Sequence, residues 1–367
     1  MKILEVIFNL SPGGAERFVV DLSNELAKTD EVILLAINKD TVDVENRNFY
    51  KFDLSSKVTY QCLQQPNGIS IKKIWKIYKA FKTINPDVIH LHGCPMPYFC
   101  IVAILFLCRR IKFYQTIHSD LDNGYVNWFY KLLFGLLSRS GLYGIVALSE
   151  QNYAQVKRVY PKAKSTCIPN GRSPICRTSK YDEVKNELMQ YKHNDESLIF
   201  LHVARFNAQK NQLLLIKSFN QFIENGANAE LICIGVGYDS EEGKKLQSQA
   251  CERIHFIGPR KNISDYMLAS NIFCLSSDYE GMPITLIEAS LAGLPSISTP
   301  VGGVQSIIKN EINGIISKDH SVQSYLRGIQ YVYRNYSTLR KNAELMKDES
   351  DFTISQCSNR YRSFFEE

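Results

Sequence analysis

Short apolar runs alternate with longer amphipathic segments along all 367 residues of this chain, in two successive series. Strands that alternate with helices form parallel sheets built from βαβ units, and a chain of this length can bury two cores. The first series predicts strands at Ile3–Phe8, Val32–Ile37, Val58–Cys62, Val88–Leu91, Phe113–Ile117, Gly144–Leu148 and Thr166–Ile168. The second predicts strands at Leu198–Val203, Leu231–Ile234, Ile254–Ile257, Ile272–Leu275, Ser296–Ser298 and Gly314–Ile316. Predicted helices include Ala15–Ala27, Ile71–Ile84, Leu213–Glu224 and Ser321–Arg334.

The two series predict an α/β protein with two domains. A polar stretch without strand character begins at Arg172-Ser-Pro-Ile and separates the series, with a short helix possible at Val184–Tyr191. We therefore expect an N-terminal domain over residues 1–178 and a C-terminal domain over residues 179–345. Residues 346–367 are polar and have the pattern of a helix.

The composition is that of a globular protein, with 45% hydrophobic and 22% charged residues. The longest apolar run, Tyr98–Cys108, is shorter than the ~20 residues that cross a bilayer and suits a buried helix. The ten cysteines show no zinc-ligand spacing, and several, such as Cys100, Cys233 and Cys274, lie in apolar patterns. We expect reduced core thiols and a cytoplasmic location.

Positive charge is concentrated in the first half of the chain. Residues 1–178 carry 23 Lys and Arg against 14 Asp and Glu, whereas residues 179–367 carry 20 against 23. A basic half can face anionic lipid or a pyrophosphate-bearing acceptor, and an ordinary solvated surface is the alternative.

Two carboxylates, Glu280 and Glu288, are the strongest functional signal. Glu280 follows a predicted strand, and Glu288 lies about one turn inside the next predicted helix. Ligands of open α/β sheets bind outside the carboxyl ends of strands, where a helix start also attracts anions. Gly281 and Pro283 predict a turn that brings the backbone close to a ligand. Two surface glutamates are the plainer interpretation.

The pattern of Glu280, seven residues, Glu288 and then Ala-Ser-Leu-Ala-Gly-Leu-Pro resembles the signature of the retaining glycosyltransferases of family four. Further segments resemble the family in order and spacing: Ser11-Pro-Gly-Gly-Ala-Glu-Arg17, Asp87-Val-Ile-His-Leu-His-Gly93, Thr116-Ile-His-Ser119, Ile168-Pro-Asn-Gly171 and Val203–Gln212. Together they cover nearly the whole chain. The resemblance implies the GT-B fold, two Rossmann-like domains facing each other across a cleft. It also implies that the terminal helix returns to brace the first domain.

The resemblance assigns the donor nucleotide-sugar mainly to the second domain. It implies that Glu280 binds sugar hydroxyls, that Glu288 binds the ribose, and that Arg205 and Lys210 bind the diphosphate. The chain departs from the commoner family pattern at Ala204 and Gln209, and both cations remain. The other expected donor contacts are Gly14, Gly235, Gly237, Ile257, Gly281, Met282, Pro283, Ile284 and Thr285.

The first domain is expected to hold the acceptor. Gly13 and Gly14 open the first helix, where glycines let a ligand approach the backbone; a plain tight turn is the alternative. His118 follows a predicted strand, and the family's matching histidine contacts the sugar at the reaction centre. Asp120 is a second polar candidate there. His90 and His92 are expected to be structural hydrogen-bonding residues at a strand end, because no further metal ligands stand at matching spacing; a contact with the acceptor is the alternative.

Neither a redox cofactor nor a metal is expected. Gly235-Val-Gly237 lacks the third glycine and the acidic residue of a dinucleotide fingerprint, which disfavours a nicotinamide dehydrogenase. Asp278-Tyr-Glu280 resembles the Asp-x-Asp of metal-dependent transferases, but its place before Glu288 argues against that role. The segment Tyr125–Arg139 is amphipathic with basic edges, so it can lie on a membrane surface or pack in the core.

The sequence thus predicts a retaining, metal-independent glycosyltransferase. It would move a hexosyl or N-acetylhexosaminyl group from a uridine-based nucleotide-sugar to a saccharide or polyprenyl-pyrophosphate-linked acceptor in surface polysaccharide synthesis. The enzyme would be cytoplasmic, with the inner face of the cell membrane as a candidate partner and no nucleic acid. A non-catalytic nucleotide-sugar-binding partner in a polysaccharide assembly complex is the alternative. An epimerase of the same fold lacks support from the two glutamates.

Overall fold

The computed structural model divides the chain into two compact units. It describes residues 1–39, 48–68, 70–93, 102–103, 111–118, 132–133, 135–137, 139, 141, 143–348 and 350–367. Unit 1 comprises Met1–Ser173 together with Phe352–Glu367, and unit 2 comprises Pro174–Asp351. The sequence analysis set these boundaries at residues 178 and 345. The apolar run Tyr98–Cys108 and the amphipathic segment Tyr125–Arg139 lie largely outside the described residues.

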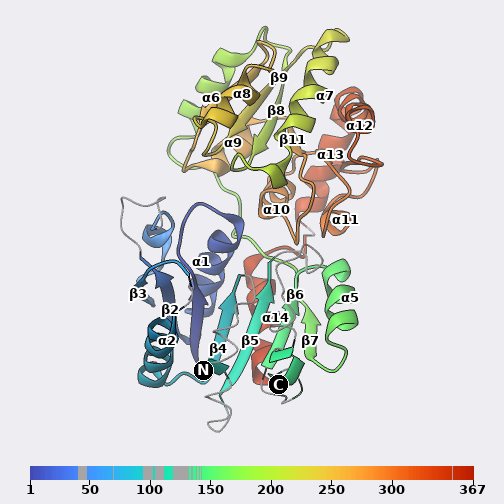
Figure 1. Cartoon of the computed structure of the whole chain (residues 1–367). Coiled ribbons are helices and arrows are strands. Elements are labelled where there is room, and N and C mark those ends of the chain that lie inside the picture. Colours follow the sequence, from blue (N-terminus) through green and yellow to red (C-terminus); the bar gives the residue numbers. More distant parts are fainter. Residues whose placement is uncertain are drawn as a thin grey trace. The chain divides into compact units, whose positions relative to one another are not determined.

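Unit 1 is built on a parallel sheet. In the described residues this sheet has seven strands in the order β3-β2-β1-β4-β5-β6-β7 (Figure 1). The strands are β1 (Lys2–Ile7), β2 (Glu31–Asn38), β3 (Val58–Gln65), β4 (Val88–His92), β5 (Lys112–Ile117), β6 (Tyr143–Ala147) and β7 (Lys164–Cys167). The helices are α1 (Gly14–Leu26), η1 (Lys51–Asp53), α2 (Ile71–Ile84), α5 (Glu150–Val159) and α14 (Ile354–Glu366).

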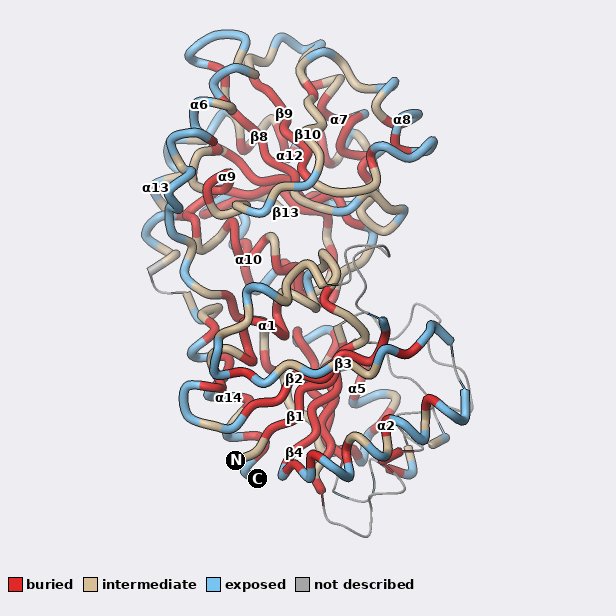
Figure 2. Tube along the Cα trace, turned by 90° about the vertical axis from the view of Figure 1, so that its left-hand side faces the viewer, coloured by how far each residue is buried: buried red, intermediate tan, exposed pale blue. Residues whose placement is uncertain are grey.

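Helices cover both faces of this sheet, which is why its strands are apolar on both sides. Leu4, Ile89 and Phe113 pack with α2 and α5 in one core cluster. On the other face, Phe18 of α1 lies against Tyr361 of α14, with ring centroids 6.0 Å apart. Figure 2 shows the strands as a buried band, with α1 and α14 on one side and α2 and α5 on the other.

Unit 2 repeats this plan. Its described residues form a six-stranded sheet in the order β10-β9-β8-β11-β12-β13, again parallel throughout. The strands are β8 (Leu198–Val203), β9 (Ala229–Ile234), β10 (Ile254–Gly258), β11 (Ile272–Leu275), β12 (Ser296–Ser298) and β13 (Gly314–Ile316). The helices are α6 (Tyr181–Tyr191), η3 (Ala208–Lys210), α7 (Gln212–Glu224), α8 (Glu241–Gln247), α9 (Ile263–Ala269), α10 (Ile284–Leu291), α11 (Val304–Ile307), α12 (Val322–Arg334) and α13 (Tyr336–Asp348).

Both units are therefore parallel sheets covered by helices, as the sequence predicts. In unit 2, Phe200, Cys274 and Ile297 pack with α7 and α12 in one core cluster. Several helices begin at side chains that accept a backbone N–H, the usual way of satisfying the first turn. Ser70 caps α2, Asn211 caps α7 and Ser321 caps α12 in this manner.

The chain returns to unit 1 through α14. The backbone of Arg172 donates to Phe352 O over 2.8 Å and accepts from Ile354 N over 2.9 Å. Gly171 lies against this crossing, because a Cβ added there would lie 2.6 Å from Thr353 O and 2.9 Å from Ile354 Cα. The glycine of the Ile168-Pro-Asn-Gly171 segment thus lets the start of α14 dock closely.

We expect Gly171→Ala to destabilise unit 1. The added methyl group must push against α14 backbone, and overpacking of this kind costs about 1–3 kcal/mol. Thermal unfolding followed by circular dichroism measures the loss as a lower Tm. Gly135→Ala is the matched control, because a Cβ there would meet nothing within 4 Å. Equal Tm values for the two variants would contradict the close docking of α14.

Candidate functional site

In unit 2, the segments that follow β8 and β11 bring two predicted site residues into contact. These strands are neighbours at the point where the strand order reverses, the usual ligand position of an open α/β sheet. The Lys210 ammonium lies 2.5 Å from Glu280 Oε1, and both side chains are largely buried. Ser277 Oγ donates to the same carboxylate oxygen over 2.6 Å. Lys210 and Glu280, which the sequence analysis assigns to the same nucleotide-sugar, therefore form an ion pair with each other.

Further hydrogen bonds tie these two segments together. Gln209 Nε2 donates to Tyr279 O over 2.9 Å, and Asp278 N donates to Gln209 O over 2.8 Å. Ser276 Oγ donates to Lys210 O over 2.8 Å. Gln209, where the family commonly has an acidic residue, thus contributes its amide to the scaffold. The positions of Lys210 and Glu280 are consequently fixed by backbone contacts as well as by their ion pair.

Helix α10 carries the second glutamate. Glu288 is buried, with 6% of its surface exposed, one turn inside this helix. No side chain caps the start of α10 at Pro283, which suits a site that takes an anion or a polar ligand group. Met282 and Ile284 are buried and Thr285 is half-buried, so little of the side chains in this turn is exposed.

Glycines allow backbone segments to approach one another closely at this edge of the sheet. A Cβ on Gly235 would lie 2.0 Å from Ala204 O, and one on Gly237 would lie 3.3 Å from Phe206 Cβ. Gly302 has a φ of +43°, and a Cβ added to it would lie 2.2 Å from Glu280 O. Gly302 was missed by the sequence analysis. Its signal is the Pro300-Val-Gly-Gly303 turn after β12, at the same sheet edge as Glu280.

Two further predicted donor residues differ in how open they are. Arg205 is exposed two residues beyond β8, and its carbonyl accepts from Gln212 Nε2 over 2.9 Å. The carbonyl of Ile257 already accepts from Arg260. A carbonyl oxygen has two lone pairs, so Ile257 O can still accept a hydrogen bond from a bound base.

In unit 1, the predicted residues lie at the start of α1 and at the end of β5. Gly13 is extended and stands at the N-cap of α1, whose first residue is Gly14. His118 directly follows β5, is half-buried, and its Nε2 lies 3.1 Å from His92 Nδ1. Asp120 lies outside the described residues.

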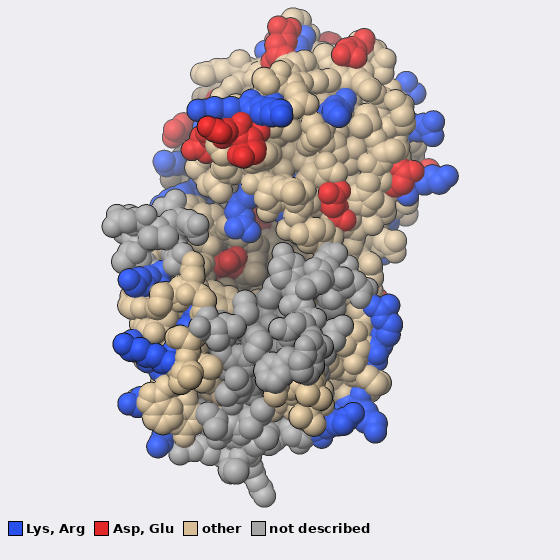
Figure 3. Space-filling model, viewed as in Figure 1, with Lys and Arg blue, Asp and Glu red and all other residues tan. Residues whose placement is uncertain are grey.

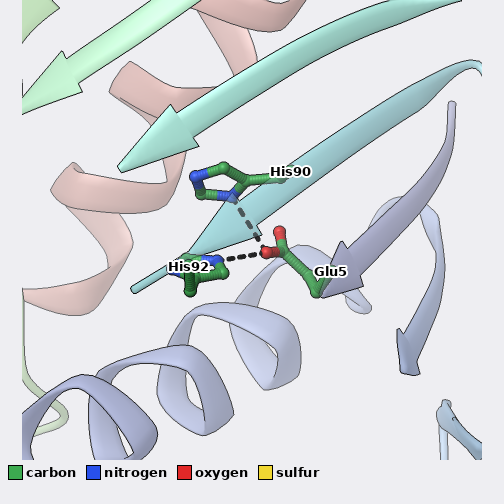
Figure 4. A group of neighbouring side chains, drawn as sticks. All are labelled: Glu5, His90 and His92. Atoms are coloured by element: carbon green, nitrogen blue, oxygen red, sulfur yellow. Dashed lines mark hydrogen bonds and ion pairs between the residues drawn. The ribbon is translucent and has the colours of Figure 1, made fainter. Parts of the chain in front are cut away.

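A buried carboxylate joins the two histidines of β4. Figure 4 shows the rings of His90 and His92 directed at the carboxylate of Glu5 on β1. Glu5 Oε2 lies 2.9 Å from His90 Nδ1 and 2.5 Å from His92 Nε2. The sequence analysis found the histidines but missed Glu5. Its signal is a lone carboxylate inside an apolar strand, a group that requires a partner when buried.

These three residues form a potential metal-ligand set. Two donors on one tetrahedral zinc ion stand roughly 3.3 Å apart, given bond lengths of about 2.0–2.1 Å. Glu5 Oε2 and His92 Nε2 are closer than that and share a hydrogen bond. The distances therefore fit a hydrogen-bonded cluster better than a metal site.

Electrostatics fix the protonation states of this cluster. Burial acts to raise the pKa of the Glu5 carboxyl, but His90 and His92 outweigh it and lower this pKa to about 2. Burial and the neighbouring His90 lower the pKa of His92 to about 4, against the attraction of Glu5. Burial, His92 and His90 hold the pKa of His118 well below its usual value. Near neutral pH, Glu5 is ionised, and His92 and His118 are neutral.

Sequence models of two families match the two units. The model described as "Glycosyltransferase Family 4" matches residues 12–174, and that described as "Glycosyl transferases group 1" matches residues 184–347. Together they account for most of the chain.

Curated relatives carry the same kind of activity in their names. An uncharacterised glycosyltransferase of Methanocaldococcus jannaschii is 26% identical over 66% of this chain and 63% of its own length. The UDP-Gal:alpha-D-GlcNAc-diphosphoundecaprenol alpha-1,3-galactosyltransferase of Escherichia coli is 24% identical over 71% of this chain and 69% of its own. A Campylobacter jejuni alpha-1,4-N-acetyl-D-galactosaminyltransferase, named for an undecaprenol-diphosphate-linked saccharide, is 24% identical over 86% and 84%.

Solved structures share the fold over the full chain. HepE of Anabaena, in complex with UDP and glucose, has a TM-score of 0.80 at 17% identity and covers 100% of this chain and 99% of its own. The sucrose-phosphate synthase of Thermosynechococcus elongatus has a TM-score of 0.78 at 18% identity, with 99% and 98% covered. The chain belongs to the glycosyltransferases of the GT-B fold, with a family 4 domain followed by a group 1 domain.

Proposed function

We propose that this chain is a retaining transferase that moves a hexosyl or N-acetylhexosaminyl group from a UDP-sugar to a lipid-linked saccharide. The product would enter surface polysaccharide synthesis. The contact between Lys210 and Glu280 carries the proposal, because it gathers a cation and a carboxylate at the ligand-binding edge of unit 2. The named substrates of the Escherichia coli and Campylobacter jejuni relatives support a lipid-linked acceptor, and the UDP complexes of HepE support the nucleotide.

Each residue has a proposed role. Lys210 and Arg205 neutralise the diphosphate as its bond to the sugar breaks, so no metal ion is needed for that purpose. Glu280 accepts hydrogen bonds from sugar hydroxyls, and Glu288 accepts them from the ribose. The leaving phosphate takes the proton of the acceptor hydroxyl. His118 steadies the reacting sugar. At the start of α1, Gly14 lets the donor approach the backbone and Gly13 lets the acceptor approach it.

A role as a non-catalytic nucleotide-sugar binder is less well supported. A protein that no longer catalyses transfer is free to lose residues that act only on the sugar. In this chain Glu280 is present and bonded to both Lys210 and Ser277. Binding and transfer assays separate the two roles.

A membrane surface is the further proposed partner, and α2 is the face that supports it. This helix contains no acidic residue, and its lysines at 72, 76, 79 and 82 are exposed. Ile71 and Trp75 are also exposed, at 87% and 52%. Figure 3 shows basic side chains along the edge of unit 1 where α2 lies in Figure 1. No helix in the described ranges has the length and apolarity to cross a bilayer, so contact would be with the surface.

The first expected outcome concerns nucleotide binding. Lys210→Ala weakens UDP binding about 10- to 100-fold, because a charge-assisted contact to phosphate contributes roughly 1.5–3 kcal/mol. Isothermal titration calorimetry in EDTA measures the Kd and also tests binding without a metal. Lys217→Ala, an exposed lysine of α7, is the control and leaves the Kd unchanged. Equal UDP affinities of the two variants would show that Lys210 does not contact the diphosphate.

The second outcome separates transfer from binding. Glu280→Ala lowers transfer about 100- to 1,000-fold, the cost of losing one strong transition-state contact. UDP alone still binds, because the substitution frees Lys210 from its intramolecular partner. Release of UDP from the UDP-sugar in the presence of acceptor measures transfer. Near-normal transfer by this variant would refute the assignment, whereas UDP binding by a wild-type chain without transfer would favour the binding protein.

The third outcome concerns the membrane. Lys76→Ala with Lys79→Ala weakens binding to anionic phospholipid vesicles roughly thirtyfold, because each basic residue near such a surface contributes about 1 kcal/mol. Vesicle co-sedimentation at fixed salt measures this. Lys244→Ala with Lys245→Ala on α8 removes the same charge from an exposed site in unit 2. Equal losses in both double variants would mean that net charge, and not α2, drives binding.

A further inference from the structure

A buried chain of hydrogen bonds connects Glu5 to His118. It runs from Glu5 Oε2 to His92 Nε2 over 2.5 Å and from His92 Nδ1 to His118 Nε2 over 3.1 Å. Glu5 and His92 are 0% and 1% exposed, while His118 is only half-buried. The chain therefore leads from the middle of the sheet to the carboxyl end of β5, where the sequence places a site residue.

The protonation states give every bond in this chain one direction. Ionised Glu5 can only accept, so His92 must donate its Nε2–H. A neutral imidazole has a single N–H, so His92 Nδ1 must accept and His118 must donate its own Nε2–H. His118 Nδ1 then carries no proton and acts as an acceptor. One carboxylate thus fixes the tautomers of two histidines.

A second branch holds the carboxylate from the side of α14. His90 Nδ1 lies 2.9 Å from the same Glu5 oxygen. His90 Nε2 lies 2.8 Å from Thr116 Oγ1, which lies 2.8 Å from the hydroxyl of Tyr361. This branch does not include His118. Substitutions in it can therefore test whether an effect comes from the network as a whole or from the path to His118.

Aromatic rings enclose both branches. Phe18 of α1 packs edge-on against His92 and His118, with centroids 6.1 and 5.8 Å away. Phe365 of α14 packs edge-on against His90 at 5.2 Å. In such an apolar surrounding, hydrogen bonds are stronger and polarise one another, so the charge of Glu5 is felt at His118.

We propose that Glu5 and His92 are positioning residues that hold His118 as the neutral Nε2–H tautomer and make its Nδ1 a hydrogen-bond acceptor for a hydroxyl of the substrate. The role in turnover rests on the proposed function, since it requires His118 to contact the reacting sugar or acceptor. The tautomer itself does not. A neutral acceptor of this kind selects a hydroxyl and gives no attraction to the diphosphate, which is left to Lys210 and Arg205.

Nitrogen-15 NMR of labelled histidine tests the tautomer directly, because the chain has only seven histidines. The His118 signals are assigned by their loss in His118→Asn. Wild-type protein is expected to show a protonated Nε2 and a bare Nδ1, unchanged from pH 6 to 8. In His92→Phe, which keeps a ring against Phe18, His118 is expected to mix tautomers and to titrate nearer its ordinary pKa. A protonated Nδ1 in wild type, or an unchanged His118 spectrum in the variant, would overturn the proposal.

Measurements of kcat test whether the positioning of His118 serves the transfer reaction. His92→Phe and Glu5→Gln are expected to lower kcat about tenfold or more, with UDP affinity unchanged, because UDP is assigned to unit 2. Glu5→Gln serves as the second variant, since it keeps the shape of the side chain. Tyr361→Phe is the matched control: it removes a buried hydroxyl from the other branch and should leave both kcat and the His118 spectrum unchanged.

The remaining outcomes keep this proposal separate from the proposed function. An altered His118 tautomer with unchanged kcat would overturn the positioning role and leave the transferase assignment intact. A wild-type chain that neither binds UDP nor releases it from UDP-sugars would refute the transferase assignment instead. The metal content of the purified protein gives the last test. One equivalent of a transition metal in the wild type, absent from both Glu5→Gln and His92→Phe, would show a metal site and overturn the hydrogen-bonded chain.

Discussion

The reversal of strand order within each parallel sheet governs where the chemistry of this chain is placed. Parallel strands bring their carboxyl ends to one edge, and connections leave in opposite directions only at the reversal point. In unit 1 this point lies between β1 and β4, which carry Glu5 and the histidine pair. In unit 2 it lies between β8 and β11, which lead to Lys210 and Glu280. The same topological constraint thus serves two chemically different clusters.

Sequence reasoning succeeded where burial alone determines structure. The strands Leu198–Val203 and Ile272–Leu275 and the helix Ile71–Ile84 have the predicted bounds, because uninterrupted apolar runs and helical periodicity mark them directly. GT-B topology followed from counting two such series and from the family motifs. The approximate sites of Lys210 and Glu280 followed as well, since each comes after a strand of the second series.

Long-range polar contacts were beyond the sequence. Glu5 was missed because its partner His92 stands 87 residues away in the chain. The ion pair between Lys210 and Glu280 spans 70 residues, so the motifs predicted both residues without predicting that they touch. The close approach of Gly302 to Glu280 at the sheet edge was missed for the same reason, because it joins residues far apart in the chain. Periodicity reports which face of an element is buried, and it carries no information on which distant polar group completes that face.

The two clusters solve the problem of a polar group in an apolar setting in opposite ways. At Lys210 and Glu280, each charge offsets the desolvation of the other. Under the proposed function, a diphosphate or sugar replaces the partner of either charge. At Glu5, the charge stays permanently buried, and only its effect on proton positions reaches His118. Charges that can change partners suit a surface at which an anionic ligand binds and leaves. A permanently buried charge suits the opposite task, which is to keep the protons of neighbouring groups in fixed positions.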